Sequence, residues 1–271
     1  MHRELKTDIK FDDFWTVFGP RGFVAMAWWL GAQHADRIRK EQTSFPLLYV
    51  TGTAQSGKTL LLTYLTRLLG DEPFPDKSSP DDDISTVQLA THLNRPVLVY
   101  EVSDEPERDL NLDVLLPLSD GGRFKLSLNG KSTEVEFRGG LAINGPDSAS
   151  RLYIDSRLLN LELVGRDSTP DAEHSLQVLR KLEVGDAGRF RQMSEVFATD
   201  FFGFFNRGAR AYMMAILNEH GRFINDRAAR NYGQVMALVD ILSLLLSLPN
   251  EQRILIQEEV QHMAIFERMP I

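Results

Sequence analysis

The sequence predicts an α/β protein in which a core of strands and helices lies between two helical segments. Strand-length apolar runs, among them residues 45–50, 96–100 and 140–143, fall between about residues 40 and 168. On both sides of this stretch the apolar residues recur at helical spacing instead. We therefore expect an N-terminal helical segment at 1–40, a core with a parallel sheet sandwiched by helices at 41–168, and an all-helical domain at 169–271.

The N-terminal segment is dense in aromatic and apolar residues and is expected to form helices. Its apolar positions between residues 11 and 38 follow helical spacing, and Gly19-Pro20 predicts a break within them. The C-terminal part shows five further helical patterns. They cover Leu176–Leu182, Phe190–Phe205, Ala209–Leu217, Asp226–Leu248 and Gln252–Phe266. We expect the aromatic run Phe201–Phe205 to be core.

The first core strand leads into a glycine-rich turn and then into a predicted helix from Lys58 to Leu69. The turn, Gly52–Thr59, fits the pattern G-x-x-x-x-G-K-[ST] at every position. Its glycines let the backbone bend so that successive N–H groups face a phosphate, and the following helix directs its positive dipole end at the same anion. The sequence therefore predicts a phosphate-binding loop.

Nucleoside triphosphate is the ligand that this loop predicts, with ATP and Mg²⁺ as the expected pair. Lys58 would reach the β- and γ-phosphates, and the Thr59 hydroxyl would hold Mg²⁺. The expected nucleotide contacts are Gly52, Thr53, Ala54, Gln55, Ser56, Gly57, Lys58, Thr59 and Leu60.

Two polar residues at later strand ends are candidates to complete a hydrolytic site. Glu101 follows the apolar run at 97–100, where P-loop ATPases place an acid that polarises water, and it is also a candidate Mg²⁺ ligand. The alternative is that Glu101 marks where an edge strand meets solvent. Asn144 follows residues 140–143 and either orients the attacking water or serves the turn before Gly145.

Arg151 and Arg157 precede a last strand at 158–163, and each is a candidate phosphate contact or an ordinary surface arginine.

A β-hairpin is predicted between these strands. The runs 124–128 and 133–137 alternate apolar and polar residues, and they flank Asn129-Gly130, which favours a tight two-residue turn.

The composition narrows the function classes. The chain has 271 residues, of which 43% are apolar and 25% charged, as in a globular protein. It has no cysteine, which excludes disulfides, cysteine-based zinc sites and a thiol nucleophile, and a cytoplasmic location is expected.

The longest mostly apolar stretch, residues 236–248, is shorter than the roughly 20 residues of a membrane span. No signal segment is expected at the N-terminus. The net charge of −8 restricts any DNA contact to a local surface.

The order of these pieces resembles the ATPases of superfamily 3 helicases, and in particular the primase-associated helicase domains of phages, plasmids and related mobile elements. These belong to the AAA+ group of P-loop NTPases. The similarity covers residues 40–168, with Gly52–Thr59 as the phosphate loop, Glu101 as the strand-end acid and Asn144 as the sensor asparagine. It implies a ring, usually a hexamer, in which Arg157 acts on the γ-phosphate of the neighbouring subunit.

The resemblance also implies a hairpin segment that faces single-stranded DNA, matched here by residues 118–131. The candidate DNA contacts are Arg123, Lys125 and Lys131. With Arg138, the segment has four cations against the three acids Asp120, Glu134 and Glu136, which is only a thin positive excess for a DNA contact. Tyr100 stands where many relatives carry a metal-coordinating Asp, so Mg²⁺ can depend on Thr59 and water, with Glu101 mainly polarising water. No primase domain is recognisable, which makes a primase or polymerase module an expected partner.

The leading hypothesis is an ATP-hydrolysing DNA helicase or translocase of phage- or plasmid-type replication. Two other classes stay open. A small-molecule P-loop kinase would need an acceptor pocket, for which the sequence gives no signal. A nucleotide-gated DNA-binding or assembly protein with little hydrolysis is suggested by Tyr100.

Overall fold

A computed structural model describes residues 2–71, 97–101, 115–121, 123–128, 131–145, 155–165, 169–196 and 198–266. A solvated loop expected from composition at residues 70–84 lies outside these ranges from residue 72 onward, and so does Arg151.

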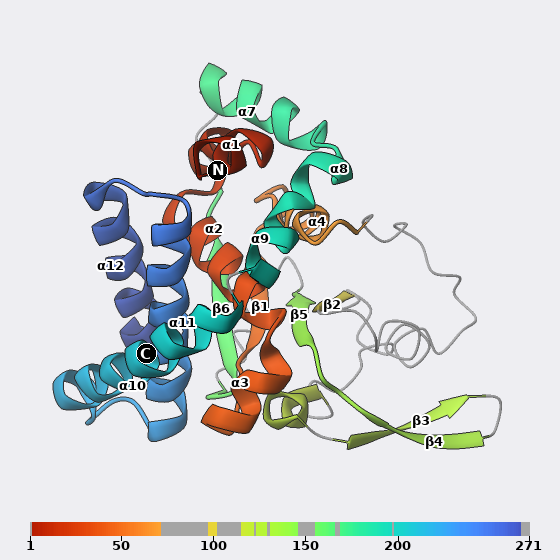
Figure 1. The fold of residues 1–271 in the computed structure, drawn as a ribbon, viewed down its shortest axis with the longest axis vertical. Coiled ribbons are helices and arrows are strands. Elements are labelled where there is room, and N and C mark those ends of the chain that lie inside the picture. The colour runs from red at the N-terminus through yellow and green to blue at the C-terminus, as the bar shows by residue number, and fades with distance from the viewer. Residues whose placement is uncertain are drawn as a thin grey trace.

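The core is a four-stranded parallel sheet with the order β2-β5-β1-β6 (Figure 1). Its strands are β1 (Leu47–Gly52), β2 (Val97–Glu101), β5 (Gly140–Asn144) and β6 (Leu158–Leu163). Because the strands are parallel, all four end at the same edge of the sheet. β5 lies between β1 and β2, so the strand that carries Glu101 is separated from the strand of the phosphate loop by one strand.

Both faces of β1 are buried, as is usual for a strand of a parallel sheet. Leu48 and Val50 share one hydrophobic core with α2 (Phe11–Ala32) and α4 (Lys58–Leu68). The alternate residues Leu47 and Tyr49 are at most 1% exposed. The predicted α/β core with a parallel sheet is therefore confirmed, and the helix at 58–69 is present with its end one residue earlier.

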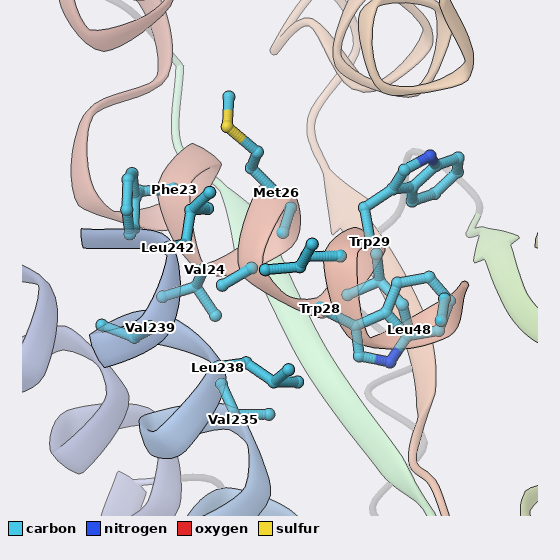
Figure 2. Close-up of a cluster of buried hydrophobic side chains, with 14 of the residues drawn as sticks. Phe23, Val24, Met26, Trp28, Trp29, Leu48, Val235, Leu238, Val239 and Leu242 are labelled. Atoms are coloured by element: carbon cyan, nitrogen blue, oxygen red, sulfur yellow. The ribbon is translucent and has the colours of Figure 1, made fainter. Parts of the chain in front are cut away.

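Helix α2 lies between the sheet and α11 (Asp226–Leu245), as Figure 2 shows. Val24 and Phe23 face α11, whereas Trp28 lies beside Leu48 and donates a hydrogen bond from Nε1 to the carbonyl oxygen of Pro46 at 2.8 Å. The predicted break is present, since Gly19 has φ 54° and ψ −147° and kinks the helix before Pro20. Two shorter helices, α1 (His2–Asp8) and α3 (Ala35–Gln42), flank α2.

The predicted hairpin is present as β3 (Arg123–Leu128) and β4 (Lys131–Glu136). Leu128 pairs with Lys131 at the end of the ladder, and the predicted Asn129-Gly130 turn lies outside the described residues. A 3₁₀ helix, η1 (Leu116–Asp120), precedes β3. The hairpin extends away from the sheet at the lower right of Figure 1.

Six helices are described after β6. They are α7 (Pro170–Arg180), α8 (Val184–Ala187), α9 (Arg189–Val196), α10 (Ala198–His220), α11 and α12 (Asn250–Phe266). Thr169 and Asn225 cap α7 and α11 by accepting hydrogen bonds from the backbone N–H groups of Ala172 and Ala228.

The sequence pattern predicted that one helix ends at Phe205 and another begins at Ala209. This prediction was wrong, because α10 continues through both residues without a break. The physical reason is helix packing. A Cβ on Gly208 would lie 3.2 Å from the Cβ of Ala237, so this glycine lets α10 approach α11 closely instead of ending the helix. In the aromatic run, Phe201, Phe202 and Phe205 are core as expected, whereas Phe204 is 62% exposed.

None of the described helices combines the length and the apolar content that crossing a bilayer requires.

Candidate nucleotide site

The predicted phosphate loop joins the end of β1 to the start of α4. Three of its residues have positive φ, with values of 146° at Gly52, 64° at Gln55 and 97° at Gly57. The N–H of Ser56 donates to the carbonyl oxygen of Thr53 at 3.1 Å and closes the turn. Gly57 precedes α4 and offers no side chain to cap it, so the positive dipole end of this helix is directed at the loop. This backbone has the form of an anion-binding nest.

Gly52 is required by packing as well as by its backbone angle. A Cβ at this position would lie 2.4 Å from the carbonyl oxygen of Leu163 and 2.7 Å from Oγ of Ser56. The loop is therefore pressed against the end of β6, which fixes where its N–H groups point.

Lys58 folds back over the loop that precedes it. Its Nζ donates to the carbonyl oxygen of Gly52 at 2.9 Å, and only 8% of the residue is exposed. Thr53, Ala54, Gln55 and Thr59 are exposed on the outer side, and Leu60 is half-buried. A buried ammonium group that bridges the loop would exchange its carbonyl partner for phosphate oxygens without a large movement.

The structure brings the ends of β1, β5 and β2 together beside this loop. Asn144 pairs with Val50 on one side and with Glu101 on the other, so Glu101 and Asn144 occupy neighbouring register positions at the same edge. Since adjacent strands lie about 4.8 Å apart, the backbone of Glu101 is roughly 10 Å from that of β1. Asn144 is 7% exposed, and the N–H of Gly145 continues the sheet by donating to the carbonyl oxygen of Val50 at 2.7 Å.

Arg157 lies at the opposite edge of the sheet. Its carbonyl oxygen accepts from the N–H of Leu47 at the start of β1. Leu163, at the other end of β6, pairs with Gly52 of the loop. Arg157 precedes Leu163 by six residues, so their Cα atoms are about 20 Å apart at the usual rise of a strand. The structure therefore does not bring Arg157 to the phosphate loop of its own chain.

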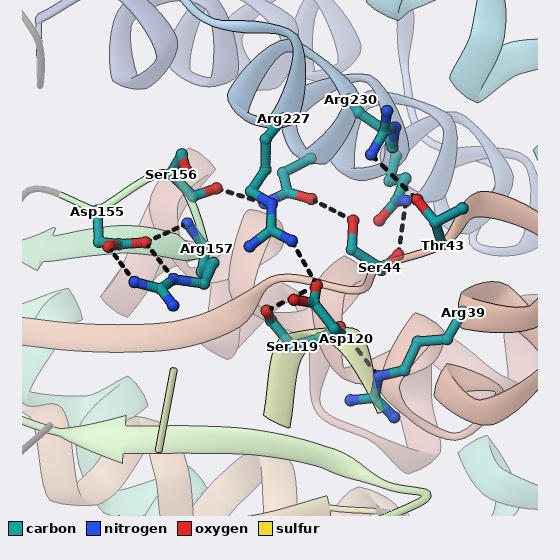
Figure 3. A network of polar contacts seen from close by, with 12 residues as sticks. Arg39, Thr43, Ser44, Ser119, Asp120, Asp155, Ser156, Arg157, Arg227 and Arg230 are labelled. Carbon is teal, nitrogen blue, oxygen red and sulfur yellow. Dashed lines mark hydrogen bonds and ion pairs between the residues drawn. The ribbon is translucent and has the colours of Figure 1, made fainter. Parts of the chain in front are cut away.

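A bidentate ion pair holds the Arg157 side chain in place (Figure 3). Its Nε and Nη2 donate to the two carboxylate oxygens of Asp155 at 2.8 and 2.7 Å. These hydrogen bonds hold the pKa of Asp155 below its ordinary value, and the charge of nearby Arg227 acts in the same direction. Arg227 itself pairs with Asp120 at 2.6 Å. No local pattern in the sequence indicates that Arg227, at the start of α11, belongs to this network.

Comparisons with known proteins bear on the fold. No protein-family model and no curated protein sequence matches the chain. Its structure is similar to that of the active helicase Cch of SCCmec type IV, with a TM-score of 0.61 over 93% of this chain and 12% sequence identity. The chain spans 50% of the length of that helicase structure. The chain has a helicase-like fold.

Within this helicase-like fold, the register of the hairpin separates the candidate DNA contacts. Arg123 pairs with Glu136 and Lys125 with Glu134, whereas Lys131 pairs with Leu128 beside the turn. Both acids therefore occupy register positions opposite a candidate cation, and Glu136 also forms an ion pair with Arg138 at 3.0 Å. Of the three candidate DNA contacts, Lys131 is therefore the one that is paired in the register with an uncharged residue, Leu128.

The ends of α4 and β2 beside this loop carry oxygen donors that bear on Mg²⁺ binding. The described residues contain no cluster of three or more His, Asp or Glu side chains that would hold a metal alone. Mg²⁺ normally needs fewer protein ligands, because it keeps several waters and binds phosphate oxygens. A threonine hydroxyl in the first turn of α4 and a carboxylate on β2 are oxygen donors of the kind it prefers, so Thr59 and Glu101 fit this ion.

Proposed function

We propose that this chain is the ATPase module of a DNA helicase or translocase, which hydrolyses ATP at the edge of the sheet to move on single-stranded DNA. The observation that carries the proposal is the alignment of three strand ends. The phosphate loop follows β1, Asn144 ends β5, and Glu101 ends β2, all at one edge of the sheet. One strand, β5, separates Glu101 from the loop, and we place the terminal phosphate and the attacking water at this edge of the sheet.

The proposed chemistry assigns each residue a role. The loop N–H groups and Lys58 bind the triphosphate and offset the charge that develops on it. Thr59, with Glu101, would hold Mg²⁺, which neutralises phosphate charge when bound. Glu101 accepts a proton from the attacking water, and Asn144 orients that water. The water oxygen bonds to the γ-phosphorus while the bond to the leaving oxygen of ADP breaks, which yields ADP and free phosphate.

The position of Arg157 supports a trans role. It lies too far from the loop of its own chain to contact the γ-phosphate there, so a phosphate contact requires the loop of another copy. We propose that it acts as an arginine finger on the neighbouring subunit of a ring, with a hexamer favoured, and that the chain belongs to the AAA+ group and superfamily 3. Single-stranded DNA would contact the β3–β4 hairpin, with Lys131 as its first candidate. Phage- or plasmid-type replication and a primase or polymerase partner belong to the same proposal.

ATP turnover with and without single-stranded DNA tests the proposal, with free phosphate as the measured product. We expect DNA to stimulate phosphate release and its binding to weaken steeply as salt rises. Lys58→Ala should abolish ATP binding, whereas Lys40→Ala, which changes a lysine whose side chain is 71% exposed on α3, should leave it intact. Glu101→Gln should keep ATP binding and lower turnover by about 100-fold or more.

Other outcomes would favour the alternative classes. A phosphorylated metabolite in place of free phosphate would indicate a kinase. Tight ATP binding with DNA binding that depends on it, but negligible turnover, would indicate a nucleotide-gated binding or assembly protein. Undiminished ATP affinity in Lys58→Ala would remove the nucleotide site itself.

A further inference from the structure

The β3–β4 hairpin is tied to the body of the protein by one buried arginine, Arg39 of α3. Only 7% of this residue is exposed. Its Nε donates to the carbonyl oxygen of Ser119 at 3.1 Å (Figure 3). Its Nη1 and Nη2 donate to the carbonyl oxygens of Arg138 and Gly139 at 3.2 and 2.7 Å. One guanidinium group therefore satisfies three backbone acceptors.

These acceptors lie in the two segments that flank the hairpin, which we call its legs. Ser119 is in η1, just before β3, and Arg138 and Gly139 follow β4. The guanidinium also lies 5.2 Å from the ring centroid of Phe137, on the second leg. On the first leg, Gly121 has φ 76°, and a Cβ there would lie 3.0 Å from Cδ of Arg39. The side chain thus fills the space where the two legs meet.

Burial lowers the pKa of Arg39 to about 10, and the carboxylates of Asp36 and Asp120 oppose this shift. The guanidinium is therefore still charged at neutral pH. Because burying a charge costs free energy unless it is hydrogen-bonded, the loss of any of the three carbonyl contacts would destabilise this arrangement.

Strand β5 connects this anchor to the nucleotide site. Gly139 leads directly into Gly140, the first residue of β5, and the strand ends at Asn144 beside Glu101. The start of the strand is held against α2, because a Cβ on Gly140 would lie 2.6 Å from the Cβ of Ala32. One strand therefore runs from the residues that Arg39 holds, past the contact with α2, to Asn144.

We propose that Arg39 is a positioning residue that fixes the base of the β3–β4 hairpin to the core, so that DNA contact at the hairpin changes ATP turnover through β5. The DNA part of this inference rests on the proposed function, whereas the anchoring of the hairpin does not. Spatial continuity alone does not demonstrate coupling, so the test measures it directly.

The test uses Arg39→Lys, which keeps the charge but cannot span three carbonyl oxygens with a planar fork. The matched control is Lys40→Met, which removes a charge from the next, exposed position of α3. ATP turnover is measured for each with and without single-stranded DNA. Because the chain has no cysteine, spin labels on Glu134→Cys and Glu251→Cys would also report the distance between the hairpin and α12 in the full chain.

We expect Arg39→Lys to keep basal turnover and the KM for ATP within about twofold while stimulation of kcat by DNA falls roughly five- to tenfold. The distance distribution between the two labels should broaden. Lys40→Met should match the parent in both measurements. Parent-like stimulation in Arg39→Lys would overturn the coupling, and so would an equal loss of basal and stimulated turnover.

The two parts of the inference fail in different ways. If DNA does not stimulate the parent protein, the proposed function and the coupling fail together, and the spin labels still decide the anchoring. An unchanged label distribution in Arg39→Lys would overturn the anchoring whatever DNA does.

Discussion

Gly52→Ala perturbs the phosphate loop at the point where the structure leaves no space. The added Cβ would lie 2.4 Å from the carbonyl oxygen of Leu163, and this backbone atom cannot move aside by a change of rotamer. A residue other than glycine at φ 146° adds strain of about 1–3 kcal/mol. The loop or the end of β6 must therefore shift, which would misplace the N–H groups that we propose bind phosphate. We expect ATP affinity to fall at least about tenfold, which corresponds to ~1.4 kcal/mol.

The assay pairs this variant with Gly203→Ala, a glycine in α10 where an added Cβ meets nothing within 4 Å. In an exposed helix, alanine is favoured over glycine by about 0.5–1 kcal/mol, so this control should be as stable as the parent or slightly more stable. Gly52→Ala should melt at least about 2 °C lower, since each kcal/mol shifts Tm by roughly that amount or more in a chain of this size. Parent-like nucleotide titration and melting in Gly52→Ala would refute the assigned loop geometry.

Three further outcomes test other parts of the structure. Gly233→Ala would bring a Cβ to 2.6 Å from the carbonyl oxygen of Ala209, so thermal unfolding should show a loss of about 1–3 kcal/mol; an unchanged Tm would contradict the close packing of α10 and α11. Burial lowers the pKa of His34, and the charge of Arg37 adds to this effect. The unfolded chain therefore takes up a proton below about pH 6.5 before the folded one does, and stability should fall as the pH drops below that value. His34→Gln should flatten this pH dependence of Tm, and parallel curves would exclude His34 as its source. If Arg157 acts in trans, Arg157→Ala and Lys58→Ala subunits, each inactive alone, should regain part of the ATP turnover when mixed; mixed oligomers without any recovery would count against the trans role.

The local parts of the fold could be predicted from the sequence because each depends on residues that are close in the chain. The loop Gly52–Thr59 needs its own glycines and the helix that follows. The antiparallel pairing of β3 and β4 follows from two alternating runs that are separated by only a few residues. The kink at Gly19 likewise follows from the residue itself and the proline after it.

Long-range arrangement could not be predicted in the same way. Nothing in the sequence pattern places β5 between β1 and β2, although this order is what sets Asn144 beside Glu101. Gly208 has the same local signature as a helix breaker, and only its contact with Ala237 explains why α10 continues. The hydrogen bonds of Arg39 could not be predicted either, because its acceptors are backbone carbonyls 80 to 100 residues away and carry no side-chain signal.

The central claim is that the edge formed by β1, β5 and β2 binds and cleaves a nucleoside triphosphate. The most direct measurement is a crystal structure of the full chain with Mg²⁺ and a non-hydrolysable ATP analogue. The account predicts the triphosphate on the N–H groups of Gly52–Thr59, with the γ-phosphate facing the carboxylate of Glu101. A nucleotide bound elsewhere, or a Glu101 carboxylate directed away from the γ-phosphate, would contradict it.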